Sequence, residues 1–218
     1  MTVLMVDVGG SHVKFMNARD GEMRKLKSGL KLSGAEMVEG VLAATADWTY
    51  DAVSIGYPGL LQKGRPIRDP GNLGEGWLNF DFEKAFGKPV RIINDAAMQA
   101  LGSYEGGRML SLGLGTGLGT TFIIDKTIAP MELAHLPYRK GHTFEDYVGE
   151  RGLVRLGRRR WERAVHDVTA RLKAALVADY AVIGGGNSKK LEELPPGGRL
   201  GNNANAFTGG FRLWQDYA

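Results

Sequence analysis

The chain has 218 residues, a length that suits one large domain or two small lobes. It contains no cysteine, which excludes disulfides and thiolate metal sites. No apolar run approaches the roughly 20 residues that span a bilayer, and no basic leader precedes the first apolar run at Thr2. We therefore expect a cytoplasmic protein with no secretion signal and no membrane partner. The net charge of +4 suits an anionic substrate but does not require one.

Strands and helices alternate in the predicted first half of the chain. Ser33 and Glu36 form a Ser-x-x-Glu capping box, which predicts a helix over residues 34–46. Further helices are predicted over residues 80–86 and 96–105. Apolar runs predict strands at 2–8, 13–17, 23–26, 52–57 and 90–93. Residues 60–76 are rich in Gly, Pro and Arg and are predicted to be loop.

The pattern restarts after Gly106-Gly107. Strands are predicted at 109–114, 120–125 and 180–183, and a last helix at 203–213. A long helix between them has one apolar face, formed by Trp161, Val165, Val168, Leu172 and Leu176. A strand, a glycine turn and a second strand therefore occur twice. This weak internal duplication indicates two similar α/β lobes with a cleft between them.

The first glycine turn lies in the segment Asp7-Val8-Gly9-Gly10-Ser11-His12-Val13-Lys14. Consecutive N–H groups in such a turn can form a nest that binds an anion. Ser11 adds a hydroxyl, Lys14 adds positive charge, and Asp7 could hold Mg²⁺ through water. Taken alone, the segment is better explained by a plain β-hairpin with a glycine turn.

The second glycine turn has the sequence Gly113-Leu114-Gly115-Thr116-Gly117-Leu118-Gly119. Its alternating glycines match neither the Rossmann spacing nor a Walker A loop, and it connects two strands. Small residues, free N–H groups and a threonine hydroxyl suit a phosphate. A flexible hairpin is the alternative, although two such hairpins in one chain are less expected by chance than one.

Three groups of side chains are further candidates. Asn94-Asp95 begins a helix, where either residue can serve as a plain N-cap, but an Asp at a strand end can also accept a proton from a substrate hydroxyl. Glu132-x-x-His135, followed by Glu145, could bind a metal, bind sugar hydroxyls or be structural. The run Arg158-Arg159-Arg160 fits a solvated amphipathic helix better than a nucleic-acid patch, so no nucleic-acid partner is expected.

In this order the motifs resemble those of one family, the ROK sugar kinases, and most closely its polyphosphate-glucokinase-like branch. The resemblance covers nearly the whole chain. The matching segments are Asp7–Lys14, Asn94–Ala96, Leu112–Gly119, Glu132–Leu136, Phe144–Gly149 and Val182–Lys190.

The resemblance implies an α/β chain with the actin-like ATPase (ribonuclease H-like) fold, built as two lobes with a central cleft. We expect the lobes at residues 1–93 and 94–202, with a helix at about 203–218 packing back on the first. It also implies Mg²⁺-dependent phosphoryl transfer from ATP or polyphosphate to a hexose, most simply glucose to glucose 6-phosphate, and a homodimer.

The resemblance further implies roles for individual residues. Asp95 would be the general base at the 6-hydroxyl of the sugar. The sugar would be held by Asn72, Asn94, Glu132, His135 and Glu145, with Gly76 or Trp77 nearby. The phosphates would be held by Asp7, Gly9, Gly10, Ser11, Lys14, Gly115, Thr116, Gly117, Gly185, Gly186 and Lys189. Asp7 would also hold Mg²⁺ through water.

The chain departs from the family pattern in two places. Many ROK kinases have a cysteine-rich zinc site, but here cysteine is absent, so no zinc is expected. Ala134 replaces the usual glycine before His135, where its methyl group could crowd the turn. Two alternative functions remain open, a kinase for N-acylated hexosamines and a non-catalytic sugar-binding or regulatory protein. The glycine spacing argues against a dinucleotide-dependent oxidoreductase.

Overall fold

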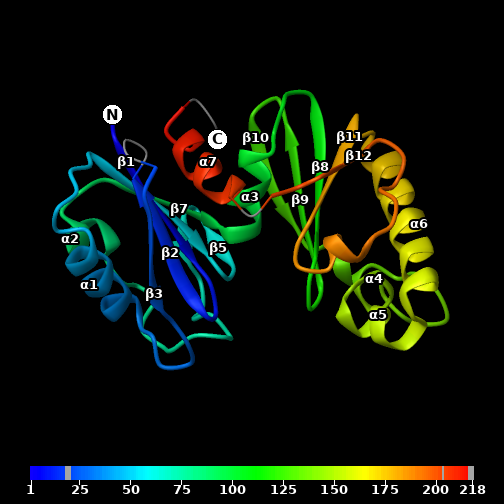
Figure 1. The fold of residues 1–218 in the computed structure, drawn as a ribbon, viewed down its shortest axis with the longest axis horizontal. Helices are drawn as coiled ribbons and strands as arrows, with labels where there is room; N and C mark the ends of the chain where they lie inside the picture. The colour runs from blue at the N-terminus through cyan, green and yellow to red at the C-terminus, as the bar shows by residue number, and fades with distance from the viewer. Residues whose placement is uncertain (18–20, 203, 216–218) are drawn as a thin grey trace. The chain divides into compact units, whose positions relative to one another are not determined.

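The computed structural model describes residues 1–17, 21–202 and 204–215. The chain forms two compact units (Figure 1). Unit 1 holds Met1–Met98 and the segment that returns from Ala206 onward, and unit 2 holds Gln99–Asn205. Each unit has its own sheet and its own core.

The sheet of unit 1 has the strand order β3-β2-β1-β4-β7. β1 pairs with β2 in antiparallel and with β4 in parallel orientation, so Asp7 lies opposite Lys14 on one side and Gly56 on the other. The strands are β1 (Val3–Val8), β2 (His12–Asn17), β3 (Met23–Lys27), β4 (Ala52–Tyr57) and β7 (Val90–Asn94).

Two helices cover one face of this sheet. The predicted capping box begins α1 (Gly34–Ala44), and Asp81 caps the short α2 (Phe82–Phe86). Side chains alternate across a strand, so β1 directs Leu4, Val6 and Val8 to this side. They pack in one buried core with Met37, Val38, Val41, Phe82 and Phe86 from the helices and Trp77 from the loop.

The opposite face of the sheet is covered by α7 (Asn205–Arg212). Val3 and Met5 of β1 form a smaller buried cluster with Phe207, and Met16 and Trp214 pack against it. The buried hydroxyl of Ser54 on β4 donates to Gly210 O at 2.5 Å and accepts from Trp214 Nε1 at 2.9 Å. Polar contacts therefore fasten this C-terminal segment to the N-terminal sheet.

The sheet of unit 2 has the order β10-β9-β8-β11-β12. β8 runs antiparallel to β9 and parallel to β11. The strands are β8 (Arg108–Leu114), β9 (Leu118–Ile124), β10 (Thr127–Met131), β11 (Tyr180–Gly184) and β12 (Gly198–Leu200). α3 (Asp95–Gly102) contains the division between the two units.

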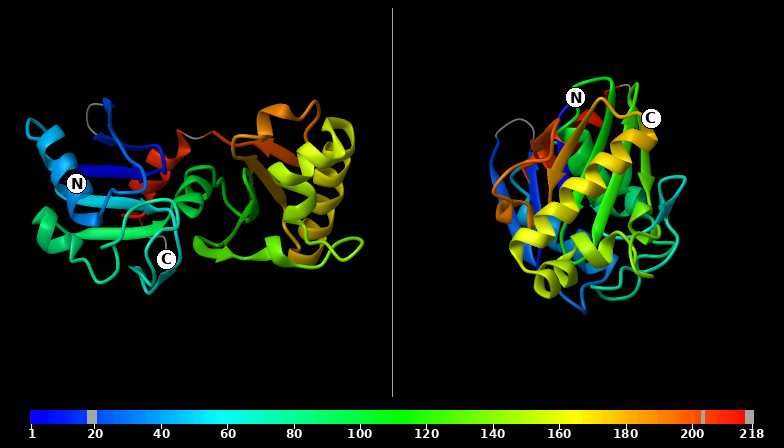
Figure 2. Two further views of the ribbon diagram at one scale, coloured as in Figure 1. Left: turned by 90° about the horizontal axis from the view of Figure 1, so that it is seen from below. Right: turned by 90° about the vertical axis from the view of Figure 1, so that its right-hand side faces the viewer.

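Helices cover one face of the second sheet, where α6 crosses the strands in the right-hand view of Figure 2. α6 (Arg158–Leu176) buries Trp161, Val165, Val168 and Leu172, which confirms the predicted apolar face. The remaining helices are η1 (Leu133–His135), α4 (Glu145–Val148), α5 (Glu150–Leu156) and η2 (Ser188–Lys190). No helix in the described ranges is long and apolar enough to span a membrane.

The predicted elements agree with the structure to within a few residues at their ends, but six strands and α-helices of the described residues were not predicted. Part of the predicted loop at 60–76 forms a small hairpin, β5 (Leu61–Gln62) with β6 (Arg65–Pro66). The strands β10 and β12 and the helices α4 and α5 were also not predicted. All are short, so their hydrophobic patterns have too few residues to show a period.

Candidate active site

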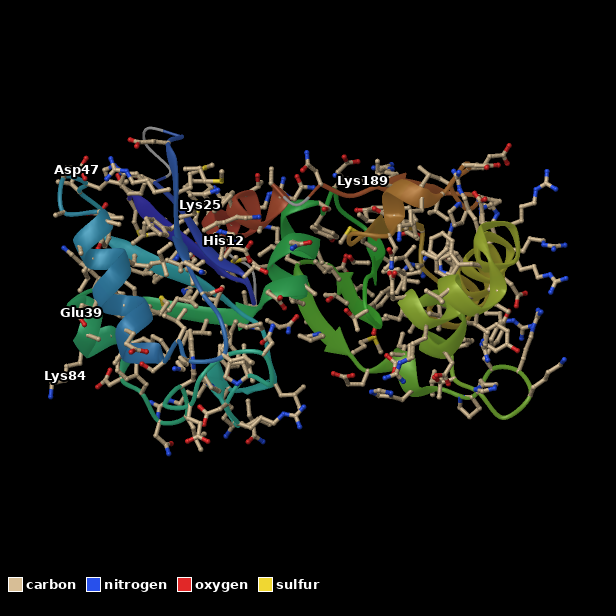
Figure 3. All side chains as sticks on the ribbon, turned by 60° about the horizontal axis from the view of Figure 1, so that its bottom comes forward. His12, Lys25, Glu39, Asp47, Lys84 and Lys189 are labelled. Carbon is tan, nitrogen blue, oxygen red and sulfur yellow. The ribbon has the colours of Figure 1, made fainter. Side chains whose placement is uncertain are left out.

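In unit 1 the first glycine turn joins β1 to β2 and is tightly held. The N–H of Gly9 donates to His12 O at 3.1 Å, and Ser28 donates its hydroxyl to Gly9 O at 2.5 Å. Over the described residues, the N–H groups of Gly10 and Ser11 have no hydrogen-bond acceptor. They remain available to an anion, as expected for a nest. His12 is exposed beside them (Figure 3).

Asn72 lies against this turn. A Cβ atom on Gly10 would lie 2.8 Å from Asn72 Nδ2, so a larger residue at this position would have to displace the Asn72 amide. Asp69 shapes the loop that presents Asn72, because its Oδ1 accepts from the N–H groups of Trp77 and Leu78 at 2.8 and 3.1 Å. Trp77 is fully buried and donates its indole N–H to Leu32 O, so its side chain anchors the loop in the core of unit 1.

Asp95 is the first residue of α3 and lies in the electrostatic field of Asp7. Burial raises the pKa of Asp95 to about 6, and the negative charge of Asp7 adds to the rise. The N–H of Ala96 donates to Asp95 Oδ1 at 2.8 Å, and this hydrogen bond lowers the pKa in part. Burial also raises the pKa of Asp7, while Lys14 across the hairpin partly offsets it. A carboxylate with a pKa near 6 is a stronger base than an ordinary Asp.

Asn94 is the N-cap of α3, one of the two roles considered from the sequence. Its Oδ1 accepts from the N–H of Ala97 at 3.2 Å, and its Nδ2 donates to Gly59 O at 3.3 Å. These bonds fix the side chain next to Asp95. They leave the second amide hydrogen for a ligand.

In unit 1, Asp7 is the residue that could hold a magnesium ion. Mg²⁺ is usually held by one or two carboxylates together with substrate phosphates and water. Across the described residues, no three His, Cys, Asp or Glu side chains gather into a metal-binding group. Asp7 is partly accessible at its strand end and beside the free N–H groups of the turn. It therefore fits as the single protein carboxylate of such an ion.

In unit 2 the second glycine turn, Gly115-Thr116-Gly117, joins β8 to β9. Gly115 N–H donates to Gly117 O at 3.1 Å, which closes the turn. Thr116 is exposed. The turn is therefore a compact loop whose middle residue is accessible to a ligand.

Glu145 links this turn to the predicted sugar ligands. A Cβ atom on Gly117 would lie 2.5 Å from Glu145 Oε2, and the other oxygen lies 3.8 Å from His135 Nδ1. His135 Nε2 lies 3.5 Å from Glu132 Oε2. The side chains of Glu132 and His135 are about two-thirds exposed, at 67% and 66%. The structure thus brings the three predicted sugar ligands of unit 2 together.

Ala134 fits without strain. It lies in η1, its methyl group is buried in the core of unit 2, and its φ angle is negative. The helical turn therefore does not require the glycine that the family usually has there.

The third predicted glycine segment also reaches the second turn. Gly185 has φ +81° and passes so close to the backbone of Leu114 that no Cβ atom fits. Gly186 follows in open space. Lys189 is exposed (Figure 3), and over the described part of the chain it forms no ion pair. Gly185 is therefore a packing residue, whereas Lys189 is free to meet an anion.

Two residues at this turn were not predicted. Glu150 donates its N–H to Gly115 O at 2.9 Å, and Asn187 donates from Nδ2 to the same oxygen at 3.1 Å. In the sequence, Gly149 precedes Glu150 and Gly186 precedes Asn187, which is only a weak sign that either residue contacts the turn. Neither residue carried a motif of its own, so only the structure shows that both touch the turn.

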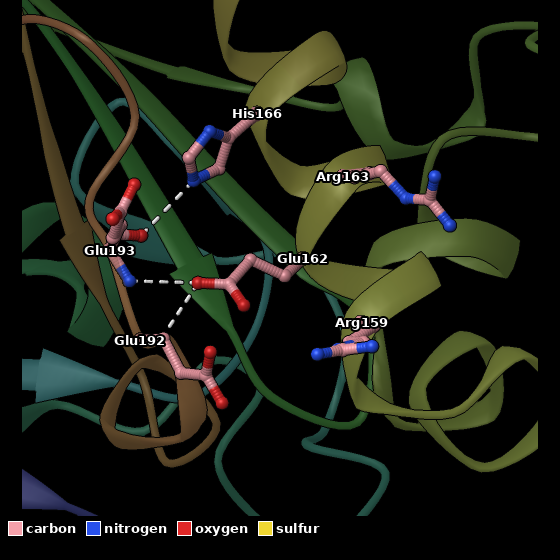
Figure 4. Close-up of a pocket in the computed structure, with 6 residues that line it drawn as sticks. All are labelled: Arg159, Glu162, Arg163, His166, Glu192 and Glu193. Carbon is pink, nitrogen blue, oxygen red and sulfur yellow. Dashed lines mark hydrogen bonds between the residues drawn. The ribbon is translucent and has the colours of Figure 1, made fainter.

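Arg159 of the arginine run lines a separate pocket of about 460 Å³ in unit 2, together with Arg163 (Figure 4). Glu162 accepts there from the N–H groups of Glu192 and Glu193 at 2.7 and 2.8 Å, and His166 Nε2 lies 3.0 Å from Glu193 O. Arg158 binds Lys190 O and pairs with Glu192. These contacts hold the loop at residues 190–193 against α6, so the polar side chains that line the pocket are explained by their structural role.

Solved structures with a similar fold include sugar kinases. The polyphosphate/ATP-glucomannokinase from Arthrobacter sp. strain KM is 23% identical, with a TM-score of 0.75 and 96% of each chain covered. A ROK family glucokinase from Streptomyces griseus, solved with glucose and AMPPNP, is 17% identical, with a TM-score of 0.75 over 98% of this chain and 99% of that one. A putative N-acetylmannosamine kinase from Listeria monocytogenes is also 17% identical, with a TM-score of 0.74 over 96% and 97%.

No protein-family model matches the chain, and no curated protein is similar to it in sequence. The structural matches show the fold. The chain is an α/β protein with the actin-like ATPase fold of the ROK proteins, so the predicted fold class and the predicted resemblance are confirmed.

Proposed function

We propose that this protein is a sugar kinase that transfers a phosphoryl group from ATP or polyphosphate to a hexose hydroxyl, most simply the 6-hydroxyl of glucose. The observation that carries the proposal is Asp95, a carboxylate at a strand-to-helix junction whose pKa is raised to about 6. The matched glucokinase and glucomannokinase, which share this fold, support the choice of reaction.

Asp95 would act as the general base. It would accept the hydroxyl proton while the sugar oxygen forms its bond to phosphorus and the donor's bridging P–O bond breaks. The bond from the Ala96 N–H to Asp95 Oδ1 fixes the carboxylate, so that the second oxygen would receive the proton. Asn72, Asn94, Glu132, His135 and Glu145 would orient the sugar through its hydroxyls.

The phosphates of the donor would bind to N–H groups of the two glycine turns, with Lys14 and Lys189 adding positive charge. Mg²⁺ held at Asp7 would neutralise phosphate charge when bound. We also propose that the protein is a cytoplasmic homodimer. That state follows from the resemblance alone.

Two other activities remain as candidates. A kinase for N-acylated hexosamines is favoured by the match to the putative N-acetylmannosamine kinase. A non-catalytic regulator is favoured by a match to a ROK family transcriptional regulator, at 15% identity and a TM-score of 0.69. Asp7 and Asp95 together argue for catalysis, because sugar binding alone has no need for two neighbouring carboxylates with raised pKa values.

The test is a matrix of purified protein with Mg²⁺, two donors and several sugars. Glucose, mannose, N-acetylglucosamine and N-acetylmannosamine would each be incubated with ATP and with polyphosphate, and sugar phosphate would be measured. Formation of glucose 6-phosphate supports the proposal and names the donor. Product from an acetylated sugar alone favours the second candidate. Sugar binding by calorimetry without any product would overturn the proposal in favour of a regulator.

A further inference from the structure

Glu150, which is exposed, and Asn187, which is buried, form one polar connection behind the second glycine turn. Asn187 is 5% exposed, and its Nδ2 donates to Gly115 O at 3.1 Å and to Glu150 Oε2 at 2.6 Å. Its backbone N–H donates to Leu114 O at 2.9 Å. Both hydrogens of the side-chain amide are therefore used, and the turn is bound to two segments far away in the sequence.

Glu150 completes the connection from the other side. Its backbone N–H donates to Gly115 O at 2.9 Å and also lies 3.3 Å from Thr116 O. Its second carboxylate oxygen lies 3.8 Å from Lys190 Nζ. Two consecutive carbonyl groups of the turn thus point toward Glu150 and Asn187.

The direction of these carbonyl groups fixes the direction of the N–H groups that follow them. A trans peptide is planar, so its C=O and N–H bonds point in opposite directions. Because Gly115 O and Thr116 O face Glu150, the N–H groups of Thr116 and Gly117 face away from it. In the described structure neither N–H has a hydrogen-bond acceptor. Two adjacent, parallel and unsatisfied N–H groups are the donors of an anion nest.

We infer that Glu150 and Asn187 are positioning residues, which hold the turn so that the N–H groups of Thr116 and Gly117 are aimed at a phosphate of the donor. This inference rests on the proposed kinase function and deepens it. Neither residue touches the phosphate. Glu150 is acidic, so a direct contact with an anion would be repulsive, which agrees with an indirect role.

The main variant is Asn187→Asp, which keeps the shape but replaces both donor hydrogens by a charge that repels Glu150. We expect the donor KM to rise about tenfold or more, since two hydrogen bonds are lost, while the sugar KM stays within about twofold. Glu150→Ala is the second variant in case the first fails to fold. Glu150→Gln retains an acceptor for Asn187 and should restore most of the donor affinity.

Glu162→Ala is the matched control. Glu162 fastens the same loop further along, at Glu192 and Glu193, without touching the glycine turn. If this control raises the donor KM as much as Asn187→Asp does, general loosening of the loop explains the effect and the inference fails. An equal rise in the donor and sugar KM of Asn187→Asp would overturn it as well.

A binding experiment tests the inference without turnover. Inorganic tripolyphosphate, titrated into ¹⁵N-labelled protein with Mg²⁺, should shift the amide signals of Thr116 and Gly117. The midpoint should move to about tenfold higher concentration in Asn187→Asp or Glu150→Ala. Unmoved signals in the unsubstituted protein, or the same midpoint in the folded variants, would overturn the inference. Absence of turnover with every sugar would instead reject the kinase proposal alone.

Discussion

At the scale of single residues, the pKa values of Asp95 and Asp7 are both raised, and the charge of Asp7 contributes to the rise at Asp95. Asp95 lies in a partly buried position where desolvation opposes its charge, and the neighbouring carboxylate opposes it further. Desolvation acts on Asp7 in the same direction, and Lys14 counteracts it. Carboxylates with raised pKa values are unfavourable for stability and are common at functional sites, which is why Asp95 and Asp7 are the candidates for mutation here.

Asp95→Asn should lower kcat by about 10²–10⁴-fold, the usual contribution of general-base assistance. The amide keeps an acceptor for the N–H of Ala96, so α3 should still begin at the same residue. Steady-state kinetics with the best sugar and donor measure the effect. Glu39→Gln, a carboxylate-to-amide change at an exposed site on α1 (Figure 3), is the matched control and should retain full activity.

The stability of the same variant provides a check on folding. The folded protein holds the proton of Asp95 more tightly than the unfolded chain does. Ionisation of Asp95 therefore lowers the stability of the fold at pH values above the unfolded pKa near 4. Asp95→Asn should therefore melt at a higher temperature than the unsubstituted protein at pH 8, with little difference at pH 4. A lower melting temperature at pH 8 would mean that lost turnover reflects damage to the fold.

The pH dependence of the rate tests the environment of Asp95. A general base must be unprotonated, so kcat/KM should rise with pH through a midpoint near 6 and then level off. Asp7→Asn removes a neighbouring negative charge, so the residual activity should show a lower midpoint. A midpoint near 4 in the unsubstituted protein would show that Asp95 is not the group that titrates.

At the scale of elements, glycine turns are held by backbone packing as well as by hydrogen bonds. Gly185 crosses Leu114 at the end of β8 with a positive φ angle, while Gly186 has open space around it. Gly185 and Gly186 therefore have different roles, although the sequence Gly-Gly-Gly gives no means of distinguishing them.

Gly185→Ala should destabilise the protein by more than about 1 kcal/mol, because the new methyl group meets the strand backbone and the φ angle becomes strained. Gly186→Ala should change the free energy of unfolding by less than about 0.5 kcal/mol, as most exposed substitutions do. Urea unfolding of both variants measures the difference. Equal effects would mean that the segment does not pack on β8 in solution.

Most elements could be predicted because their patterns are long or carry end signals. The capping box of α1 and the apolar stripe of α6 are examples. α5 was not predicted because it contains Gly152, which sits against the backbone of Tyr147 and disfavours helix in isolation. β10 contains Pro130, which suits its place at the sheet edge but weakens its signal.

The candidate site was predictable only where a motif carries it. Asp95 and the three predicted sugar ligands, Glu132, His135 and Glu145, could be proposed because their spacing matches a family pattern. Glu150 and Asn187 could not, since their role depends on contacts between segments separated by 35 to 72 residues. Asp69 was missed for a similar reason, because its partners eight and nine residues away are backbone N–H groups.

At the scale of the whole molecule, unit 1 is discontinuous in sequence. Its sheet comes from the first 94 residues, but one face is covered by α7, which follows all of unit 2. Arg91 on β7 stacks on Trp214 at 4.5 Å and also donates to Leu213 O. The C-terminal segment is therefore part of the core of unit 1.

Ser54→Ala should cost about 1–3 kcal/mol, because it leaves Gly210 O and Trp214 Nε1 without partners in a buried place. A double-mutant cycle with Trp214→Phe isolates their interaction. The double variant should lose less stability in urea unfolding than the sum of the single variants. Additive losses would show that the two side chains do not interact.

The position of α7 has a consequence for how the protein is made. The N-terminus of a chain emerges from the ribosome first, and domains usually fold in the order in which they are synthesised. Here unit 2 is continuous and can finish folding as soon as it emerges. The sheet of unit 1, although synthesised first, must wait with Val3 and Met5 exposed until Phe207 and Trp214 arrive. Premature termination before Phe207 or Trp214 would therefore damage the half of the protein that was synthesised earliest.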